Sequence, residues 1–489
     1  MRGNAGGQRT WLDYGRIGRT MYYLLTEEWI RATSKDGTSK EYGILDLILN
    51  SQELLGITDD SPIIEYGIYR FLFAFLMDAY QPETVFDITE LLERGSFDAE
   101  VIHNYITLCE GEGVSFDIFD QANPFMQETI KDDIKRKSVA ALNPIVPTGT
   151  SRTFFDHGLE NTRSFSKAEA ARALFSTTIF PRGGSGYYAC ISGEGLVFNI
   201  LMGKNLFETL VFGMVSKSDT HLDYGKPYWR DKGFAPKEKR VDTTLLYGLT
   251  FPIRQVNLLE ESEELTTIHF APGLNPSIEY WRDPYVAYQQ GKDKLYPMRA
   301  SQDQSTGALK SQWRNISTIA KKTDGILILR NAVEKEDVRV VSYAILVNNA
   351  IQNVDRSEFL LPICIYTDES KNEQVQEEIQ KCEEIASLLR KSMHDTLNRG
   401  KTKVADSAVR DYIFRYYNQC ETAFNEQITG TIDIDSWMLL VGDIAVAGFN
   451  DFVDKYCIDS DRIAEAIKQR NNMCIKLGKM GWKKTTAGN

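Results

Sequence analysis

The sequence predicts a fold of the α+β class, a large mixed α/β N-terminal domain followed by a C-terminal four-helix bundle. Two observations predict it. Between residues 21 and 367, helical and strand-like segments alternate with irregular stretches that contain proline and glycine. After Asp368 only amphipathic helices follow, and short turns join them. We therefore divide the chain into a flexible leader (1–20), a mixed α/β domain (21–367) and a four-helix bundle (368–489).

Length and composition bound the possible functions. A chain of 489 residues with 42% hydrophobic and 11% aromatic content can bury a large core. The apolar runs, such as Phe71–Met77, are too short to span a bilayer, so we expect a cytoplasmic protein without a membrane partner. Seven cysteines form no C-x-x-C pair, which predicts neither a disulfide framework nor a metal site. The net charge of −12 argues against general affinity for nucleic acid but allows local basic surfaces.

The N-terminal segment starts with a leader and a predicted hairpin. Met1–Thr20 is rich in glycine and arginine and has no periodicity, which is typical of a flexible leader. A strand is predicted over Tyr22–Ile30, and an exposed turn at Lys35–Gly37 separates it from a second strand.

A strong helix signal follows at Ile63–Tyr80, where nearly every face is apolar. Asp60 or Ser61 can cap this helix, and Pro62 suits its first turn. A helix that is apolar all round predicts the central element of the core.

The same periodicities predict the remaining elements of the first domain. Further helices are predicted over Ile88–Glu93, Asp98–Glu110, Lys167–Phe175 with Ser166 as its cap, Asn205–Val215 with Asn205 and Glu208 as a capping box, and Gly307–Ala320. Further strands are predicted over Tyr187–Ile191, Leu196–Met202, Leu249–Leu258, Leu265–Phe270, Gly325–Leu329 and Val338–Val347.

A long irregular stretch begins at Asn123 and continues past several basic residues to the cluster Phe154-Phe155-Asp156-His157. A loop of about thirty residues inside a compact domain is usually functional or disordered. We therefore treat this stretch as a candidate functional loop.

A glycine run, Pro181-Arg182-Gly183-Gly184-Ser185-Gly186-Tyr187-Tyr188, lies between a predicted helix and a predicted strand. Without side-chain bulk its backbone can approach a ligand closely and turn its N–H groups outward. Such a run suits a phosphate, a pyrophosphate or the edge of a nucleic-acid groove. The alternative is a plain tight turn with positive φ angles.

Four long helices are predicted after Asp368. In the first, apolar residues from Val375 to Thr396 recur at steps of three and four, and the others span roughly Ala405–Ile428, Ser436–Cys457 and Asp461–Gly478. The first of these helices is acidic and the last is basic, which predicts two electrostatic faces or an ordinary solvated surface.

Motifs for catalysis are missing from the sequence. The five histidines have no metal-binding spacing, and no G-x-S-x-G motif occurs. No Walker lysine follows the glycine run, since Tyr187 and Tyr188 occupy that place. The predicted order of helix, glycines and strand is the reverse of a dinucleotide fingerprint. The sequence therefore favours a protein that is not an enzyme and has no cofactor.

The order of several short motifs resembles the CasA family, the large subunits of type I-E CRISPR Cascade complexes. The resemblance covers nearly the whole chain after Met21. Besides the glycine run and the C-terminal helices, it rests on Leu24–Ile30, Asp59–Pro62, Asn123–Gln127, Phe154–His157, Leu249–Arg254 and Trp281–Pro284.

The resemblance implies a role for the glycine run. In this family a glycine loop approaches the minor groove of the protospacer-adjacent motif (PAM) of the target DNA. The corresponding residues here are Gly183, Gly184, Ser185 and Gly186. Because the minor groove carries a degenerate hydrogen-bond code, a backbone loop that reads its shape should tolerate several motifs.

The resemblance also implies a wedge that opens the first base pair. In the family a glutamine at a hairpin tip has this role, and the corresponding tip is Asn348-Asn349-Ala350-Ile351-Gln352. Asn349 or Ala350 falls where the glutamine usually sits, and Gln352 lies slightly beyond. The sequence therefore leaves the identity of the wedge residue open.

Of three further family features, the first has a counterpart in this chain, the second has no clear counterpart, and the third is missing. The mobile loop near the guide RNA corresponds to about Lys131–His157, with Phe155, Asp156 and His157 at its functional end. The lysine that reads the motif falls near Ala271 or Pro272, where His269 or Arg282 could substitute. The cysteine-rich zinc insert of some members is missing.

Two hypotheses follow. In the first, the chain is a non-catalytic Cascade subunit whose partners are the other subunits, the guide RNA, double-stranded target DNA and a recruited nuclease-helicase. In the second, it is an enzyme whose glycine run binds a nucleotide phosphate. The enzyme hypothesis predicts saturable binding of a mononucleotide to the purified chain. The Cascade hypothesis predicts no such binding and predicts duplex binding that depends on partner subunits.

Overall fold

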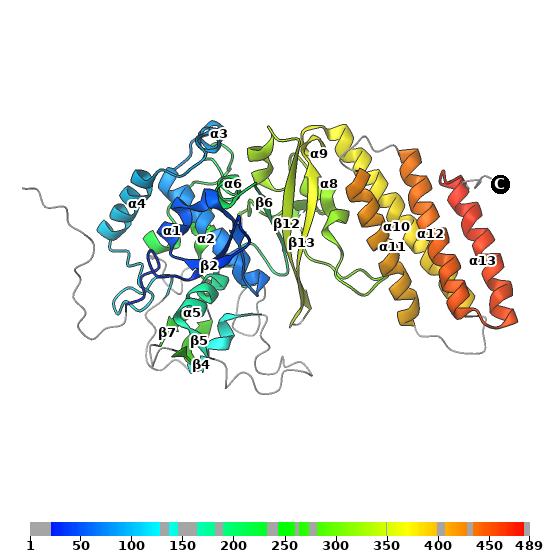
Figure 1. Ribbon diagram of the computed structural model, residues 1–489, viewed down its shortest axis with the longest axis horizontal. Coiled ribbons are helices and arrows are strands. Elements are labelled where there is room, and N and C mark those ends of the chain that lie inside the picture. Colours follow the sequence, from blue (N-terminus) through cyan, green and yellow to red (C-terminus); the bar gives the residue numbers. More distant parts are fainter. Residues whose placement is uncertain are drawn as a thin grey trace, which may run out of the picture.

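The computed structural model describes residues 21–127, 136–144, 164–180, 189–231, 243–259, 264–272, 281–348, 350–398, 406–427 and 434–483. A mixed body, a central sheet and a set of long helices follow one another along the longest axis (Figure 1). This arrangement confirms the predicted α+β class. The helices before the last four are α1 (Ile44–Leu49), α2 (Pro62–Tyr80), α3 (Val85–Arg94), α4 (Ala99–Gly111), α5 (Lys167–Leu174), α6 (Leu206–Phe212), α7 (Leu245–Thr250), α8 (Ile316–Ile319) and α9 (Ile363–Thr367).

Helix α2 is the central element of the body, as the sequence predicted. Every residue from Ile63 to Asp78 is buried. Ser61 is its N-cap, Pro62 occupies the first turn, and Gln81 ends it in the left-handed region with φ 48°. Aromatic rings from later segments pack on the helix, as Phe71 does against Phe175 at a centroid distance of 4.4 Å. The rest of the body is assembled around this helix.

All named strand pairs are antiparallel. The strands are β1 (Ile30–Ser34), β2 (Ser39–Tyr42), β3 (Leu54–Ile57), β4 (Arg136–Ser138), β5 (Phe165–Ser166), β6 (Val197–Met202), β7 (Arg254–Leu258), β8 (Glu264–Leu265), β9 (Thr267–Pro272), β10 (Tyr288–Gln290), β11 (Leu295–Pro297), β12 (Asp337–Asn348) and β13 (Ala350–Pro362). They form three-stranded sheets with the orders β2-β1-β3, β13-β12-β6 and β4-β9-β7, and the pairs β10-β11 and β5-β8.

The first hairpin starts later than predicted. Residues 22–29 are mainly turns, in which the N–H of Glu27 donates to the carbonyl of Tyr23 at 2.9 Å, and strand β1 begins at Ile30. The predicted turn at Lys35–Gly37 is present, with Gly37 at φ 83°. The pairing of β1 with β2 therefore begins at Ile30, which lies opposite Tyr42.

In the second half of the body, two predictions were right only in part and a third was wrong. Of the predicted strand Leu249–Leu258 only Arg254–Leu258 is a strand, because α7 extends to Thr250 and Pro252 cannot donate to a ladder. In the predicted helix Gly307–Ala320, helical turns begin only at Gln312, since Gly307 adopts φ 76°. The predicted strand Gly325–Leu329 runs into a 3-10 helix over Leu327–Ala332. A short apolar run does not distinguish a strand from a buried helical turn.

Two smaller differences lie beside the predicted functional segments. The irregular stretch after Asn123 contains strand β4, which pairs with β9. Residues 189–191, the described part of the predicted strand Tyr187–Ile191, form no strand. The first segment thus contributes a strand to the sheet β4-β9-β7, and the second directly follows the glycine run.

The central sheet carries a long hairpin. Strand β12 pairs with β13 along its whole length, but with β6 only from Arg339 to Ala344. The remaining part of the hairpin is therefore a two-stranded ribbon that extends past the sheet (Figure 1).

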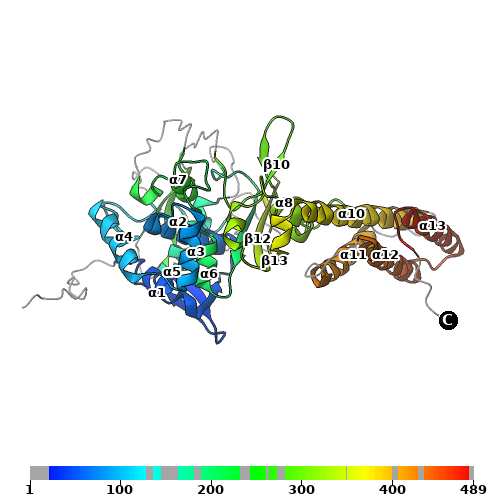
Figure 2. The same ribbon diagram turned by 90° about the horizontal axis from the view of Figure 1, so that it is seen from above.

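Four helices pack together at the C-terminal end, close to the predicted ranges. They are α10 (Glu369–Leu397), α11 (Asp406–Gln427), α12 (Ile434–Tyr456) and α13 (Ser460–Lys479). Helix α10 contacts each of the other three and leads into them from the body (Figure 2). Its apolar side chains, including Ile379, Cys382 and Leu389, are buried in a core that is continuous with that of the body. Asp368 caps α10, and its side chain accepts hydrogen bonds from the N–H groups of Ser370 and Lys371.

An arginine and a tryptophan join these helices to the body. Arg314 forms an ion pair with Asp303 of the body and another with Glu383 of α10, the latter at 3.0 Å. Its guanidinium also lies 3.8 Å from the ring centroid of Tyr417 on α11. Trp313 packs beside it on the ring of Phe424. The contacts combine charge and apolar burial at one junction.

Helix α12 alone, among the described helices, is long and apolar enough by composition to cross a membrane, over Asp435–Tyr456. Core helices of globular proteins meet the same criterion. Here Trp437, Val441 and Phe449 are fully buried, and the indole N–H of Trp437 donates to the carbonyl of Glu378 at 2.9 Å. The apolar side chains of α12 therefore pack against the neighbouring helices.

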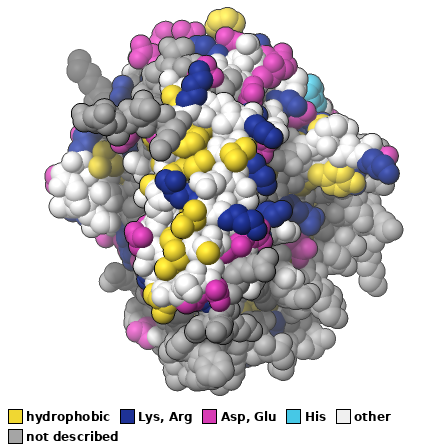
Figure 3. Space-filling model, turned by 90° about the vertical axis from the view of Figure 1, so that its right-hand side faces the viewer, with side chains coloured by type: hydrophobic (Ala, Val, Ile, Leu, Met, Phe, Trp, Pro, Cys, Tyr) yellow, Lys and Arg dark blue, Asp and Glu magenta, His cyan; other side chains and the backbone are white. Residues whose placement is uncertain are grey.

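The outer face of α13 combines apolar and basic side chains. Ile463, Ile467 and Ile475 are 44%, 59% and 60% exposed, and Lys468 and Lys476 are also exposed on this helix. The end of the molecule shows apolar and basic side chains side by side (Figure 3). The predicted basic character of the last helix thus coexists with an apolar stripe.

Candidate nucleic-acid interface

The predicted site residues fall into two groups. Gly183, Gly184, Ser185 and Gly186, together with Phe155, Asp156 and His157, lie outside the described residues, as does Asn349. Asn348, Ala350 and Gln352 belong to the described β12–β13 hairpin. The structure therefore reports on the hairpin and on the residues that flank the glycine run.

The two ends of the glycine run are held together. The N–H of Cys190 donates to the carbonyl of Phe180 at 3.0 Å, so the chain leaves and returns at one point. The Phe180 ring lies under the guanidinium of Arg254, 4.6 Å from its centroid, and 6.2 Å from the ring of Phe270. Burial raises the pKa of the Cys190 thiol, which therefore stays protonated. These contacts anchor the stem of the run on the edge of sheet β4-β9-β7.

A buried ion pair lies directly beneath this stem. Nη1 of Arg70 is 2.6 Å from Oδ2 of Asp283, and the two side chains are 1% and 0% exposed. The hydroxyl of Ser192 donates to the same carboxylate oxygen at 2.6 Å, and Nε of Arg70 donates to the carbonyl of Leu249 at 2.8 Å. Burial alone would lower the pKa of Arg70, but the Asp283 carboxylate outweighs it and raises that pKa. Arg70 therefore stays charged and joins α2 to three distant segments.

The hairpin tip is a closed turn with a glutamine folded back over it. Asn348 and Ala350 are paired in register, and the register shifts between Leu346 and Val347. Nε2 of Gln352 donates to the backbone carbonyl of Asn348 at 3.2 Å. Asn348 and Gln352 are both exposed. The tip thus presents two exposed amide side chains, those of Asn348 and Gln352, at the end of the ribbon.

A short segment links the stem of the glycine run to this hairpin. After Cys190 and Ser192 the chain reaches Gly195, whose φ of 66° favours glycine. A Cβ at this position would lie 3.3 Å from the carbonyl oxygen of Ile345 and 3.4 Å from Cβ of Val347. The segment therefore packs against β12 just before the tip. It connects the two segments that the sequence predicts to contact DNA, the glycine run and the hairpin tip.

The position of the family lysine is occupied by the end of strand β9. Ala271 and Pro272 pair with β7, and neither carries a charge. Of the two predicted substitutes, His269 is buried, with 8% of its surface exposed. Arg282 is 51% exposed and faces Asp324 at 3.7 Å. Arg282 is thus the candidate that a ligand can reach.

Sequence reasoning missed one cation at this edge. Lys137 of β4 lies with Nζ 4.7 Å from the ring centroid of Phe270, next to the position of the family lysine. The basic run that contains Lys137 was visible in the sequence, but only the pairing of β4 with β9 brings it to this edge. In the part of the chain that the structure describes, no group of three or more histidine, cysteine, aspartate or glutamate side chains could hold a metal ion.

Comparisons with known proteins bear on this arrangement. A sequence model of the family "CRISPR-associated protein Cse1" matches residues 24–447. A relative from Thermus thermophilus, named "CRISPR-associated protein CasA/Cse1", is 28% identical over 323 residues, which are 62% of this chain and 61% of the relative. The matched part thus spans about three fifths of that relative's length.

The fold is similar to several solved structures. A crystal structure of Thermus thermophilus CasA has a TM-score of 0.78 at 19% identity, and the match covers 94% of this chain and 100% of that one. Thermobifida fusca Cse1 has a TM-score of 0.76 at 18% identity, with 94% and 98% covered. A chain of a "CRISPR RNA-guided surveillance complex" has a TM-score of 0.75 at 16% identity, with 93% and 100% covered.

The structural matches support the fold, and the family model covers most of the sequence. The resemblance inferred from the order of short motifs is thereby confirmed. This chain belongs to the family of the CRISPR-associated protein Cse1, also called CasA.

Proposed function

We propose that this chain is the non-catalytic large subunit of a cytoplasmic CRISPR Cascade effector complex. In this role Gly183, Gly184, Ser185 and Gly186 contact the minor groove of the PAM in double-stranded target DNA. The hairpin tip then starts strand separation so that the guide RNA can pair. Membership of the Cse1 family and the fold likeness to a chain of a surveillance complex support this proposal.

The observation that carries the proposal is the exposed tip of the β12–β13 ribbon. The ribbon extends beyond the three-stranded sheet, so its tip can reach a duplex without moving the core. Segment 190–196 ties it to the stem of the glycine run. A DNA duplex bound at the glycine run would therefore also lie close to the hairpin tip.

The remaining partners follow from the same proposal. Phe155, Asp156 and His157 contact the guide RNA or the neighbouring backbone subunit and so dock this chain on the complex. Once the strands are separated, the surface of this subunit helps to recruit the nuclease-helicase that cleaves the target. The chain itself then needs neither a cofactor nor a catalytic residue.

The wedge can decide the rate of opening because the exchange of strands is nearly balanced in free energy. Opening one base-pair step costs about 0.6–2.2 kcal/mol of stacking, and guide pairing returns a similar amount. A few polar contacts at the first pair are therefore enough to change the rate. In this chain Asn349 and Gln352, besides Asn348 and Asn353, are the amides at the depth expected of the family's glutamine.

We expect Asn349→Ala combined with Gln352→Ala to slow strand opening on a fully paired target while initial binding to the motif survives. The measurement is the rate of guide–target pairing in the assembled complex, followed by fluorescence of a base analogue beside the motif. A target with a pre-melted bubble is the control, because it needs no wedge. Equal slowing on both targets, or no slowing on either, would show that the tip is only a turn.

A further inference from the structure

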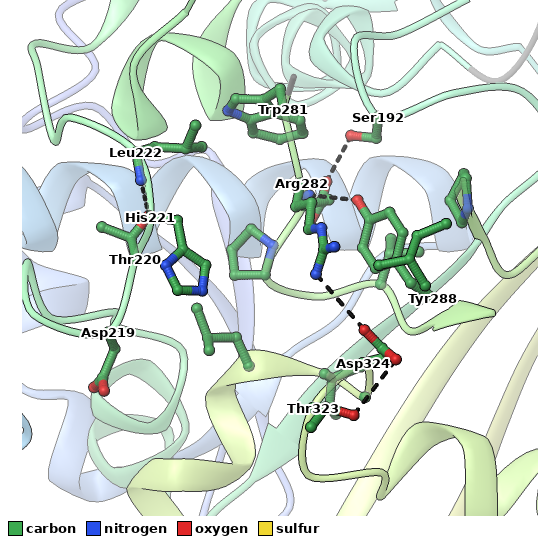
Figure 4. A pocket seen from close by; sticks show the side chains of 18 of the residues that line it. Ser192, Asp219, Thr220, His221, Leu222, Trp281, Arg282, Tyr288, Thr323 and Asp324 are labelled. Carbon is green, nitrogen blue, oxygen red and sulfur yellow. Dashed lines mark hydrogen bonds and ion pairs between the residues drawn. The ribbon is translucent and has the colours of Figure 1, made fainter. Parts of the chain in front are cut away.

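A cavity of about 780 Å³ opens beside Ser192, next to the stem of the glycine run (Figure 4). Its walls come from the 219–222 loop, the 281–288 segment, the β10–β11 hairpin and the 322–327 turn. Ligand sites in proteins commonly have volumes of roughly 300–1,000 Å³. The cavity is therefore large enough for a small organic ligand.

Positive charge gathers in this cavity. Its cationic lining residues are Arg282, Lys294, Lys322 and Arg330. Of the three carboxylates among the described lining residues, two are already neutralised, since Asp283 is paired inside the protein and Asp219 lies 2.5 Å from Arg330. Lys294 and Lys322 have no carboxylate partner within the ranges that the structure describes. On a chain with a net charge of −12, this surplus favours an anionic ligand.

Arg282 is the best placed of these cations. Its side chain points into the cavity, with His221 on the far wall (Figure 4). The guanidinium stacks over the ring of Tyr288, 5.4 Å from its centroid. Its nearest carboxylate, Asp324, is 3.7 Å away, which is too long for a hydrogen bond. The planar donor group is thus held in place while its hydrogen-bonding capacity stays available.

The rest of the lining is apolar and aromatic. Leu222, Pro284, Val286, Pro297 and Trp281 all face the cavity. Nucleobases bind on apolar surfaces and stack on aromatic rings or on the plane of an arginine. An aromatic and apolar wall beside several cations matches a ligand that carries both a base and a phosphate.

We propose that this cavity binds a nucleotide, with the base on the apolar wall and the phosphate held by Arg282 and the two lysines. The nucleotide is either a free mononucleotide or an unpaired nucleotide of a single DNA strand, which present the same chemistry. The site goes beyond the proposed function, because its described lining contains no residue of the hairpin tip and, of the residues considered above for DNA contact, only Arg282.

The test uses the purified full chain and isothermal titration calorimetry. The probes are deoxyadenosine 5′-monophosphate, deoxyadenosine and a short single strand of oligodeoxyadenylate. We expect saturable binding of the phosphate-bearing probes that weakens with salt, and at least tenfold weaker binding of deoxyadenosine, because a hydrogen bond to a charged group is lost. If only the single strand binds, the ligand is an unpaired nucleotide of a DNA strand. If the monophosphate binds, the ligand is a free mononucleotide.

Three variants assign the binding to this cavity. Arg282→Ala should weaken it about tenfold or more, whereas Lys321→Ala, which removes an exposed lysine outside the lining, should leave it unchanged. Asp324→Asn should tighten binding, because it removes the carboxylate that competes for Arg282. If the Arg282–Asp324 pair had only a structural role, Arg282→Ala and Asp324→Asn would both weaken nucleotide binding.

A further variant separates this site from a nucleotide-binding glycine run. Binding that survives Gly184→Asp but is lost in Arg282→Ala assigns the nucleotide to the cavity. The proposal is overturned if neither phosphate-bearing probe binds saturably, or if deoxyadenosine binds as tightly as its monophosphate. It is also overturned if Arg282→Ala and Lys321→Ala bind the probes with equal affinity.

Discussion

Arg70→Ala should lower the free energy of unfolding by about 3–5 kcal/mol, the cost of leaving a buried charge without its partner. The substitution removes the 2.6 Å ion pair to Asp283, whose carboxylate is fully buried. It also removes the hydrogen bond to the carbonyl of Leu249, 179 residues away. Because Arg70 is buried and bonds to three segments that are distant in sequence, a large effect is expected.

The measurement is urea denaturation followed by tryptophan fluorescence. Arg339→Ala is the matched control, because Arg339 is 58% exposed and its ion pair with Glu358 at 3.3 Å lies in solvent. Exposed pairs contribute about 0–1 kcal/mol, so this control should shift the transition little. If Arg70→Ala were no more destabilising than Arg339→Ala, the buried pair would not be a determinant of the fold.

Gly184→Asp should reduce motif-dependent binding of the assembled complex by tenfold or more and leave the subunit folded. The new carboxylate adds bulk where the backbone is proposed to lie against the groove, and it repels the phosphates on either side. Gly111→Asp adds the same charge at the end of α4, where a Cβ meets no atom within 4 Å, and should have no effect. The measurement is the affinity for duplexes with and without the motif at one fixed salt concentration.

Two outcomes would contradict this expectation. Equal motif-dependent affinity of Gly184→Asp and the parent would remove the run from the interface. Loss of folding in Gly184→Asp, seen as a lowered melting temperature relative to Gly111→Asp, would favour the simple tight turn instead.

Apolar patterns and capping residues predicted the long helices well. Helix α2, the capped helix α5 and the four C-terminal helices agree with the predicted ranges within a few residues, since each has strong caps or a long apolar pattern. Gly307–Ala320 and Gly325–Leu329 were mispredicted because their apolar residues are buried by tertiary contacts and not by a regular element. Local patterns carry no information about such contacts.

The candidate site was only partly predictable for the same reason. The resemblance pointed to the hairpin tip, and the tip at Asn348 and Ala350 lies where β12 meets β13. The Arg70–Asp283 pair joins residues 213 positions apart, which no local spacing reveals. Arg282 was considered only as a substitute for the family lysine, because its place in a cavity depends on several segments that are distant in sequence.

The most direct test of the central claim is to assemble the Cascade complex with and without this chain and to measure its affinity for two duplexes that differ only in the motif. Our account predicts that the complete complex prefers the duplex with the motif and that this preference disappears when the chain is left out, while pairing with single-stranded target is retained. An undiminished preference for the motif in the complex without this chain would contradict the account.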